Sequence, residues 1–356
     1  MINLIVFNLS VLLLLATGIT FVGIANNFDS KFYKHLAHTL IGLVVFLSVS
    51  LGMIKITRLY KYSPWLWLLT VFILVLNLFI GTTVNGSKSW IYIGNFSFQP
   101  AELAKISLCF LFVWIISILQ DRNIFFIFSI IITGFTILPI FIQPDLGFSV
   151  LLFFTTVMMG YMLGTNGILI LIVLLSTFLV AIVVIKPYQL ERLITFLDPY
   201  RDPLGSGWQT IQSVNCIING GIWGQGLGNS MISKLGFLPE KDTDFIFSLI
   251  VEHVGLIGAI IIIALYIAII LSILWTYVNS DNIQNKILSS YIMSIMFIQV
   301  FINIGMNTMS APVTGLPLPL ISYGGTNIIT TLFLLGIVNQ LNIQIARSQK
   351  IKKWIE

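Results

Sequence analysis

The sequence predicts an all-α membrane protein whose chain crosses the bilayer about ten times. Hydrophobic residues make up 57% of the 356 residues, charged residues only 9%, and the mean hydropathy is +1.00. A soluble chain is about one-quarter charged and less apolar. The composition therefore excludes a cytosolic globular enzyme and a disordered protein. The net charge of +5 forms no single basic patch, which excludes a nucleic-acid-binding protein.

Ten apolar stretches approach the length of about 20 residues that a bilayer span requires. They must be helical, because lipid offers the backbone no hydrogen-bond partners. The predicted spans cover residues 4–25, 34–54, 64–82, 100–120, 124–142, 147–164, 166–185, 245–277, 286–308 and 324–344. We expect them to form one domain over residues 1–356, with a long extracytoplasmic loop at 187–243 between the seventh and eighth spans.

The distribution of lysine and arginine predicts that both termini are cytoplasmic. The side that holds the C-terminal tail carries Lys55, Arg58, Lys61, Arg122, Lys286, Arg347, Lys350, Lys352 and Lys353. Short loops on the opposite side carry only Lys31, Lys34 and Lys88. The loop at 187–243 belongs to that second side and contains eight glycines. Its apolar runs at 211–219 and 231–235 are too short to span, so we expect them to lie at the interface or to re-enter the protein.

Ionisable residues within spans, or at their edges, are costly in a membrane and therefore indicate candidate sites. Glu102 and Lys105 are three residues apart, so on a helix they share a face and can pair. The pair either fixes helix packing or shapes a polar cavity. Asp145 follows Pro144 at an external helix break, where it either caps the next span or contributes to a site.

The densest cluster of charges covers residues 238–245, where the external loop enters the eighth span. Asp242 or Thr243 would serve as a helix cap there, with Asp244 complementing the helix dipole. Alternatively, Asp244, Ser248 and Glu252 line one helical stripe, because they are spaced by four. A carboxylate at the mouth of such a groove can act as a general base toward a sugar hydroxyl.

Other polar residues on the external side are candidates for binding or for supporting the cavity. Arg192 can grip a phosphate in a fork, whereas Arg201 and Lys234 are better explained by loop solvation. Glu240 and Lys241 belong to the charged cluster, and Ser322 follows the prolines of the last external turn. The sequence identifies no metal ligands. His253 lacks a matching histidine or cysteine, so a zinc site is not expected.

Several ordered motifs resemble the SEDS family (shape, elongation, division and sporulation), which includes FtsW, RodA and SpoVE. The motifs are Asn85-Gly86-Ser87-Lys88-Ser89-Trp90-Ile91, Phe98-Gln99-Pro100-Ala101-Glu102-Leu103-Ala104-Lys105, Gln143-Pro144-Asp145-Leu146-Gly147, Asp202-Pro203-Leu204-Gly205-Ser206-Gly207, Leu238-Pro239-Glu240, Thr243-Asp244-Phe245-Ile246-Phe247 and Pro317-Leu318-Pro319-Leu320-Ile321-Ser322-Tyr323-Gly324-Gly325. The resemblance covers nearly the whole chain. It is slightly closer to division-type FtsW over residues 223–230, although the short amino terminus is less typical of FtsW.

The resemblance implies a ten-helix peptidoglycan glycosyltransferase that polymerises lipid II at the outer face of the bacterial cytoplasmic (inner) membrane. Asp244 matches the essential aspartate of the family, and Glu102, Lys105 and Asp145 match its other charged motif residues. Asp242 stands where the family usually has histidine. The implied cofactor is a divalent cation, Mg or Mn, with no organic cofactor. The implied partners are undecaprenyl-linked glycan, a class B penicillin-binding protein (a transpeptidase) and the division or elongation machinery.

Two other functions fit an intramembrane charge pattern. One is transport, by a lipid II flippase or another carrier, since broken helices and charges within spans occur in transporters. The other is a membrane scaffold that recruits wall enzymes. The charged cluster lies at the outer mouth rather than at the midplane, and the sequence shows no inverted repeat, which favours the enzyme.

Overall fold

The computed structural model describes residues 2–355, apart from 85, 95 and 231–234. Within these residues, nine helices are long and apolar enough to cross a membrane. They are α1 (Ile2–Ala25), α2 (Ser30–Ser50), α3 (Ile56–Ile80), α4 (Pro100–Ile118), α5 (Arg122–Ile142), α7 (Gly167–Val184), α11 (Ile246–Val278), α12 (Ile283–Asn307) and α13 (Gly325–Ile355). The shorter apolar helix α6 (Leu146–Met162) matches the remaining predicted span. The prediction of an all-α protein with about ten spans is confirmed.

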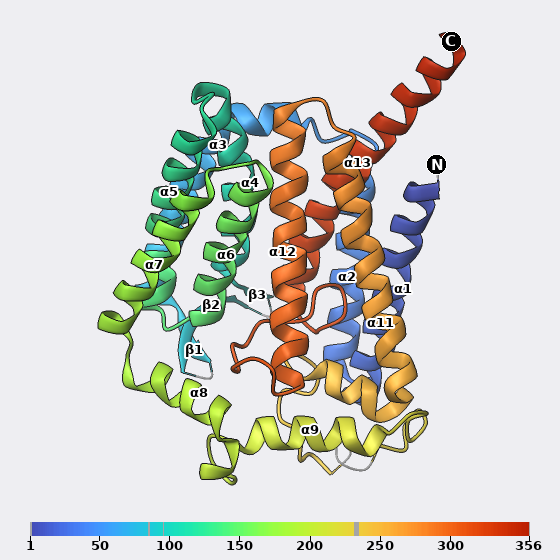
Figure 1. Cartoon of the computed structure of the whole chain (residues 1–356). Coiled ribbons are helices and arrows are strands. Elements are labelled where there is room, and N and C mark those ends of the chain that lie inside the picture. The colour runs from blue at the N-terminus through green and yellow to red at the C-terminus, as the bar shows by residue number, and fades with distance from the viewer. Residues whose placement is uncertain (1, 85, 95, 231–234, 356) are drawn as a thin grey trace.

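The helices form one bundle, and α12, α4 and α13 are the most buried of the spans that the structure describes (Figure 1). Helix α12 packs against α4, α6 and α11, while α2 runs along α13 and α3 along α4. Helix α7 lies at the edge of the bundle, and Ile170 is its one buried side chain. The two ends of the chain lie at the same end of the bundle in Figure 1, as the even number of spans requires.

The end of the bundle opposite the termini carries the longer connections between the spans (Figure 1). A three-stranded antiparallel sheet is formed there by β1 (Thr82–Val84), β2 (Ser87–Ile93) and β3 (Phe96–Phe98). This sheet was not predicted from the sequence. Gly86 and Gly94 have positive φ angles, of 81° and 62°, at the two turns, a conformation that favours glycine.

The long connection between α7 and α11 is partly helical, rather than irregular throughout. It contains α8 (Pro187–Leu197), a 3₁₀ turn η1 (Pro199–Arg201) and α9 (Trp208–Gly220). The apolar run predicted at 211–219 forms most of α9, which packs against α11. The run predicted at 231–235 falls largely outside the described residues. Helix α9 thus covers the first turns of α11, directly after the charged cluster.

Helix α11 is interrupted at Gly255, where φ is 68° and ψ is −170°. The carbonyls freed by this break accept hydrogen bonds from the connection that follows α9. Gln225 N donates to Glu252 O at 2.9 Å, and Gly226 N donates to His253 O at 3.0 Å. Backbone from another segment therefore replaces the missing helical hydrogen bonds, which a broken helix at membrane depth requires.

Candidate active site

The charged cluster at 238–245 forms a turn that ends in α11. The Glu240 backbone has a φ of 49°, and its carbonyl accepts from the N–H groups of Thr243 and Phe245 at 3.1 Å each. The helix begins at Ile246, and its capping residue is Phe245, which makes no side-chain cap. The prediction that Asp242 or Thr243 caps the helix is therefore wrong. In the first turn of α11, Ser248 N donates instead to Asn307 Oδ1 of α12 at 3.1 Å.

Asp244, the last residue of this turn before Phe245, lines a cavity of about 250 Å³. Its carbonyl oxygen accepts from Asn303 Nδ2 and Asn307 Nδ2 at 3.0 Å each, which ties the residue to α12. Burial raises the pKa of the Asp244 carboxyl to about 7, and the nearby charges of Glu240 and Asp145 act in the same direction. The carboxylate is thus poised to accept a proton near neutral pH.

Asp145 lines the same cavity and also caps α6. One of its oxygens accepts from Phe148 N at 3.1 Å, so the cap predicted from the sequence is present. The other oxygen accepts from Ser89 Oγ at 3.1 Å and from Gln99 Nε2 at 3.3 Å. Burial raises the pKa of Asp145 although these hydrogen bonds oppose the rise. The sheet, α4 and α6 meet at this one carboxylate.

Arg192 on α8 brings a positive charge to this cavity. Its Nη1 donates to the Val313 carbonyl at 3.5 Å. Its charge lowers the pKa of both Asp145 and Asp244, against the larger effect of burial. A second cavity of about 540 Å³ adjoins the first, and Arg192 and Pro144 line both. Arg192 therefore lies between two cavities, and Asp244 lines one of them.

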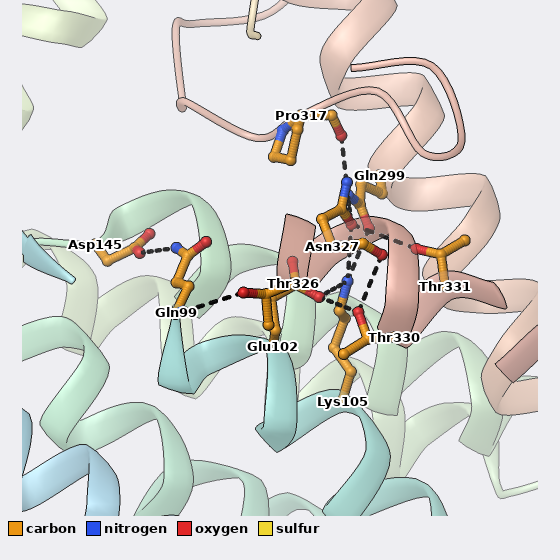
Figure 2. Close-up of polar contacts among 10 residues, drawn as sticks. All are labelled: Gln99, Glu102, Lys105, Asp145, Gln299, Pro317, Thr326, Asn327, Thr330 and Thr331. Carbon is orange, nitrogen blue, oxygen red and sulfur yellow. Dashed lines mark hydrogen bonds and ion pairs between the residues drawn. The ribbon is translucent and has the colours of Figure 1, made fainter. Parts of the chain in front are cut away.

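Glu102 and Lys105 form the predicted ion pair (Figure 2). Lys105 Nζ lies 2.7 Å from Glu102 Oε2, and both side chains are fully buried. Lys105 Nζ also donates to Gln299 and Asn327 at 3.4 Å each. Thr330 Oγ1 donates to Glu102 Oε2 at 2.5 Å. The pair thus joins α4 to α12 and α13.

Two residues connect this buried network to the cavity. Asn327 and Gln99 both line the cavity, and Figure 2 shows Gln99 reaching the Asp145 carboxylate. Neither Glu102 nor Lys105 is among the lining residues. The ion pair therefore supports the cavity wall through neighbouring residues and does not itself line the cavity that contains Asp244.

The predicted stripe of Asp244, Ser248 and Glu252 is wrong. Asp244 precedes the helix, so the spacing of four does not place it above the other two. Ser248 Oγ donates to Asn307 Oδ1 at 2.8 Å, and Glu252 Oε1 accepts from Asn219 Nδ2 at 3.0 Å. Both side chains are buried and neither is among the residues that line the cavity. They hold α9 and α12 against α11.

The remaining predicted residues surround the turn in different ways. Glu240 lines the cavity, and its Oε2 accepts from Thr243 Oγ1 at 2.8 Å. Ser322 is buried and donates through Oγ to the Thr243 carbonyl at 2.6 Å, so it supports the turn from outside the cavity. Lys241 is half-buried, and burial lowers the pKa of its ammonium group. It is not among the lining residues.

Sequence reasoning missed the neutral polar residues of the site. Ser89, Gln99, Tyr323 and Asn327 line the cavity. Asn303 and Asn307 hold the Asp244 carbonyl, as described above. The pair on α12 is spaced by four within an apolar span, and this spacing is a signal that could have identified it.

The described residues that line the cavity do not form a complete set of ligands for a metal ion. Three carboxylates, of Asp145, Glu240 and Asp244, line the cavity. Within the part of the chain that the structure describes, no three histidine, cysteine, aspartate or glutamate side chains are arranged to hold a metal ion. The residues therefore do not fit an all-protein metal site, and no chemical step is assigned to a metal here. The divalent cation stays a prediction.

The fold and the site define a class of protein: a multi-pass membrane protein in which a buried carboxylate and an arginine line one cavity at one end of the bundle. Residues 1–347 match the family model described as cell cycle protein, FtsW/RodA/SpoVE. The chain belongs to this family.

Named relatives cover most of the chain. It is 37% identical over 326 residues to the probable peptidoglycan glycosyltransferase FtsW of Wigglesworthia glossinidia brevipalpis, which covers 88% of this chain and 84% of the relative. It is 34% identical over 296 residues to the peptidoglycan glycosyltransferase MrdB of Escherichia coli K12, which covers 80% and 79%. Relatives of both types match at similar identity, so the choice of FtsW over RodA stays a prediction.

Solved structures share the fold. A chain from a peptidoglycan synthase complex that coordinates polymerization and crosslinking has a TM-score of 0.79 at 28% identity, with 95% of this chain and 97% of that chain covered. The rod shape determining protein RodA of Thermus thermophilus has a TM-score of 0.69 at 22% identity, with 95% and 96% covered. This second match supports the fold alone.

Proposed function

We propose that Asp244 is the general base of a peptidoglycan glycosyltransferase that polymerises lipid II into glycan strands. The chain is a peptidoglycan glycosyltransferase, the activity for which its relatives are named. The observation that carries the role of Asp244 is its buried carboxylate, which faces a cavity shared with Arg192. A base needs a pKa near the working pH, and an arginine suits a diphosphate.

The proposed reaction uses the Asp244 carboxylate and the Arg192 guanidinium. The Asp244 carboxylate takes the proton of the acceptor 4-hydroxyl on N-acetylglucosamine. The oxygen then forms a bond to the anomeric carbon of N-acetylmuramic acid at the end of the growing chain. The bond from that carbon to the diphosphate oxygen breaks, and undecaprenyl diphosphate leaves with the electron pair. Arg192 stabilises the developing negative charge on the leaving group.

The other charged residues act by supporting this reaction. Asp145 orients Ser89 and Gln99 at the cavity wall while capping α6. Glu102 and Lys105 hold the three helices whose ends form the cavity. Glu240 shapes the turn and adds negative charge beside Asp244.

The membrane setting and the partners are part of the same proposal. The site lies at the end of the bundle opposite the termini, and the lysines and arginines favour cytoplasmic termini. The site then faces the outside of the bacterial inner membrane. A solved neighbour belongs to a peptidoglycan synthase complex, which supports a class B penicillin-binding protein as partner, within the division or elongation machinery.

The test is polymerisation by the purified chain together with its penicillin-binding partner. Labelled lipid II is added, and glycan products are separated by length. Long glycan strands from the wild-type chain support the proposal. Transfer of lipid II across vesicles without any polymer would overturn it and favour a flippase. A sample with the partner alone controls for contaminating polymerases.

Activity is expected to rise with pH through about 7, because Asp244 accepts a proton only when ionised. The measurement is kcat/KM for polymerisation across pH 5 to 9, approximate bounds that bracket this pKa. Glu240→Gln removes a neighbouring negative charge and lowers the midpoint. Glu191→Gln, which removes a carboxylate from the second cavity, leaves the midpoint in place. A flat profile across this range would contradict the role of Asp244.

Arg192→Ala is expected to lower kcat by about 10²-fold, a typical loss when one preorganised charge-stabilising donor is removed. Arg201→Ala is the matched control, because Arg201 is exposed and lines neither of the two cavities. The rate of strand growth from labelled lipid II is compared for both variants. Equal rates in Arg192→Ala and Arg201→Ala would remove Arg192 from the mechanism.

A further inference from the structure

Interactions from outside the 240–244 turn hold the residue that we assign as the base. The Asp244 carbonyl is held by the two asparagines of α12 described above. Ser322 Oγ donates to the Thr243 carbonyl at 2.6 Å, and Tyr323 N donates to the Asp242 carbonyl at 2.8 Å. All of these contacts are made to backbone carbonyls. They would form whatever side chain stood at position 242.

The side chain of Asp242 supplies a further attachment, to the region where α1 gives way to α2. Its Oδ2 accepts from Lys31 Nζ at 3.1 Å and from Asn26 Nδ2 at 3.2 Å. The Asp242 side chain is 8% exposed and that of Lys31 is 53% exposed, so the carboxylate is the buried member of the pair. A buried carboxylate is costly unless it is paired and hydrogen-bonded.

This ion pair also contacts the wall of the cavity. Lys31 Nζ lies 5.9 Å from the centre of the Tyr323 ring, within the range of a cation–π interaction. Tyr323 lines the cavity together with Asp244. One ammonium group therefore meets both the turn that carries the base and an aromatic residue of the cavity wall.

We propose that Lys31 and Asp242 are positioning residues that fix the Asp244 carboxylate in its reactive orientation. Asp242 is two residues before Asp244 in the same turn, and its side chain ties that turn to the start of α2. The pair also neutralises a negative charge at a cavity that three carboxylates already line. This inference rests on the proposed role of Asp244 as the base.

The experiment measures kcat and KM for lipid II polymerisation in the full chain with its partner. The variants are Lys31→Met, Asp242→Asn and the charge exchange of Lys31→Asp with Asp242→Lys. Each single variant is expected to lose about tenfold in kcat, since small displacements of a catalytic group cost up to about 10²-fold. KM changes by less than about twofold, because the pair does not bind substrate. The charge exchange restores at least half of the lost rate.

The controls separate positioning from folding and from the proposed function. Lys34→Met removes an exposed lysine from the same helix and is expected to leave kcat unchanged. Thermal unfolding midpoints in detergent, equal to that of the wild type, show that the single variants are folded. Wild-type kcat in both single variants would overturn the inference alone, provided that Asp244→Asn is inactive in the same assay. An active Asp244→Asn would overturn the proposed function and the inference together.

Discussion

Asp244→Asn is expected to abolish polymerisation while leaving the protein folded. Asparagine has nearly the same shape as aspartate, and the contacts from α12 are made to the backbone carbonyl, so they persist. The amide cannot accept the proton of the acceptor hydroxyl, which removes general-base catalysis. Such catalysis contributes about 10²–10⁴-fold, so the rate should fall by about 10³-fold. Labelled lipid II and product length give the measurement.

Asp242→Asn and Asp145→Asn show whether the loss is specific to the proposed base. Asp242 pairs with Lys31 and is not among the residues that line the cavity, so its variant retains more activity than Asp244→Asn by at least about tenfold. Asp145→Asn keeps a side-chain oxygen for the cap of α6 and is also expected to retain more activity. Comparable losses in all three variants would mean that the three carboxylates contribute through their combined negative charge. That result would contradict the assignment of Asp244 as the general base.

The spans were predictable because bilayer thickness fixes the length of an apolar helix. The seventh span was expected at 166–185 and is α7, Gly167–Val184. The sheet at 82–98 was not predicted, because three short strands leave only a weak pattern between two long apolar helices. The helices α8 and α9 were missed because, at 11 and 13 residues, they are too short to give the signal of a span. Hydropathy therefore reports the spans much better than the connections between them.

The charged residues of the candidate site were predicted from the sequence, whereas the neutral polar residues that line it were not. Burying a charge is costly, so Glu102, Lys105 and Asp145 stand out in an apolar sequence. Asn327 and Gln99 join them in the structure, but a neutral amide gives no such signal. The juxtaposition of Arg192 on α8 with residues before α6 and α11 arises from the packing of distant segments. No spacing in the sequence contains that information.

The error at Ser248 and Glu252 has a definite physical origin. The spacing of four is a helical signal only when both residues belong to one helix. The turn that begins at Glu240 precedes α11, which starts at Ile246. The backbone of the turn, and not that of the helix, therefore sets the orientation of Asp244. Positive φ at a non-glycine residue such as Glu240 is uncommon and is not evident from the sequence. The span was expected to start at residue 245 and starts at Ile246, so Asp244 lies outside the helix that contains Ser248 and Glu252.

Breaking the buried ion pair of α4 is expected to cause the largest loss of stability. In Glu102→Gln, the fully buried Lys105 ammonium loses its anionic partner and keeps only two hydrogen bonds at 3.4 Å. Removing one partner of a buried pair costs about 3–5 kcal/mol, because an uncompensated charge stays inside. The measurement is the free energy of unfolding in detergent. Lys61→Met, at an exposed position in α3, is the control and should change it by less than about 0.5 kcal/mol.

The double variant Glu102→Gln with Lys105→Met decides between packing and chemistry. It removes both charges, so it should regain at least half of the stability lost in Glu102→Gln, since uncharged replacements of a buried pair are often tolerated. Because neither residue lines the cavity, the refolded double variant should also polymerise lipid II. A double variant that is stable but inactive would show that the pair takes part in the chemistry. Single variants as stable as the wild type would show that the pair does not hold α4 to α12 and α13.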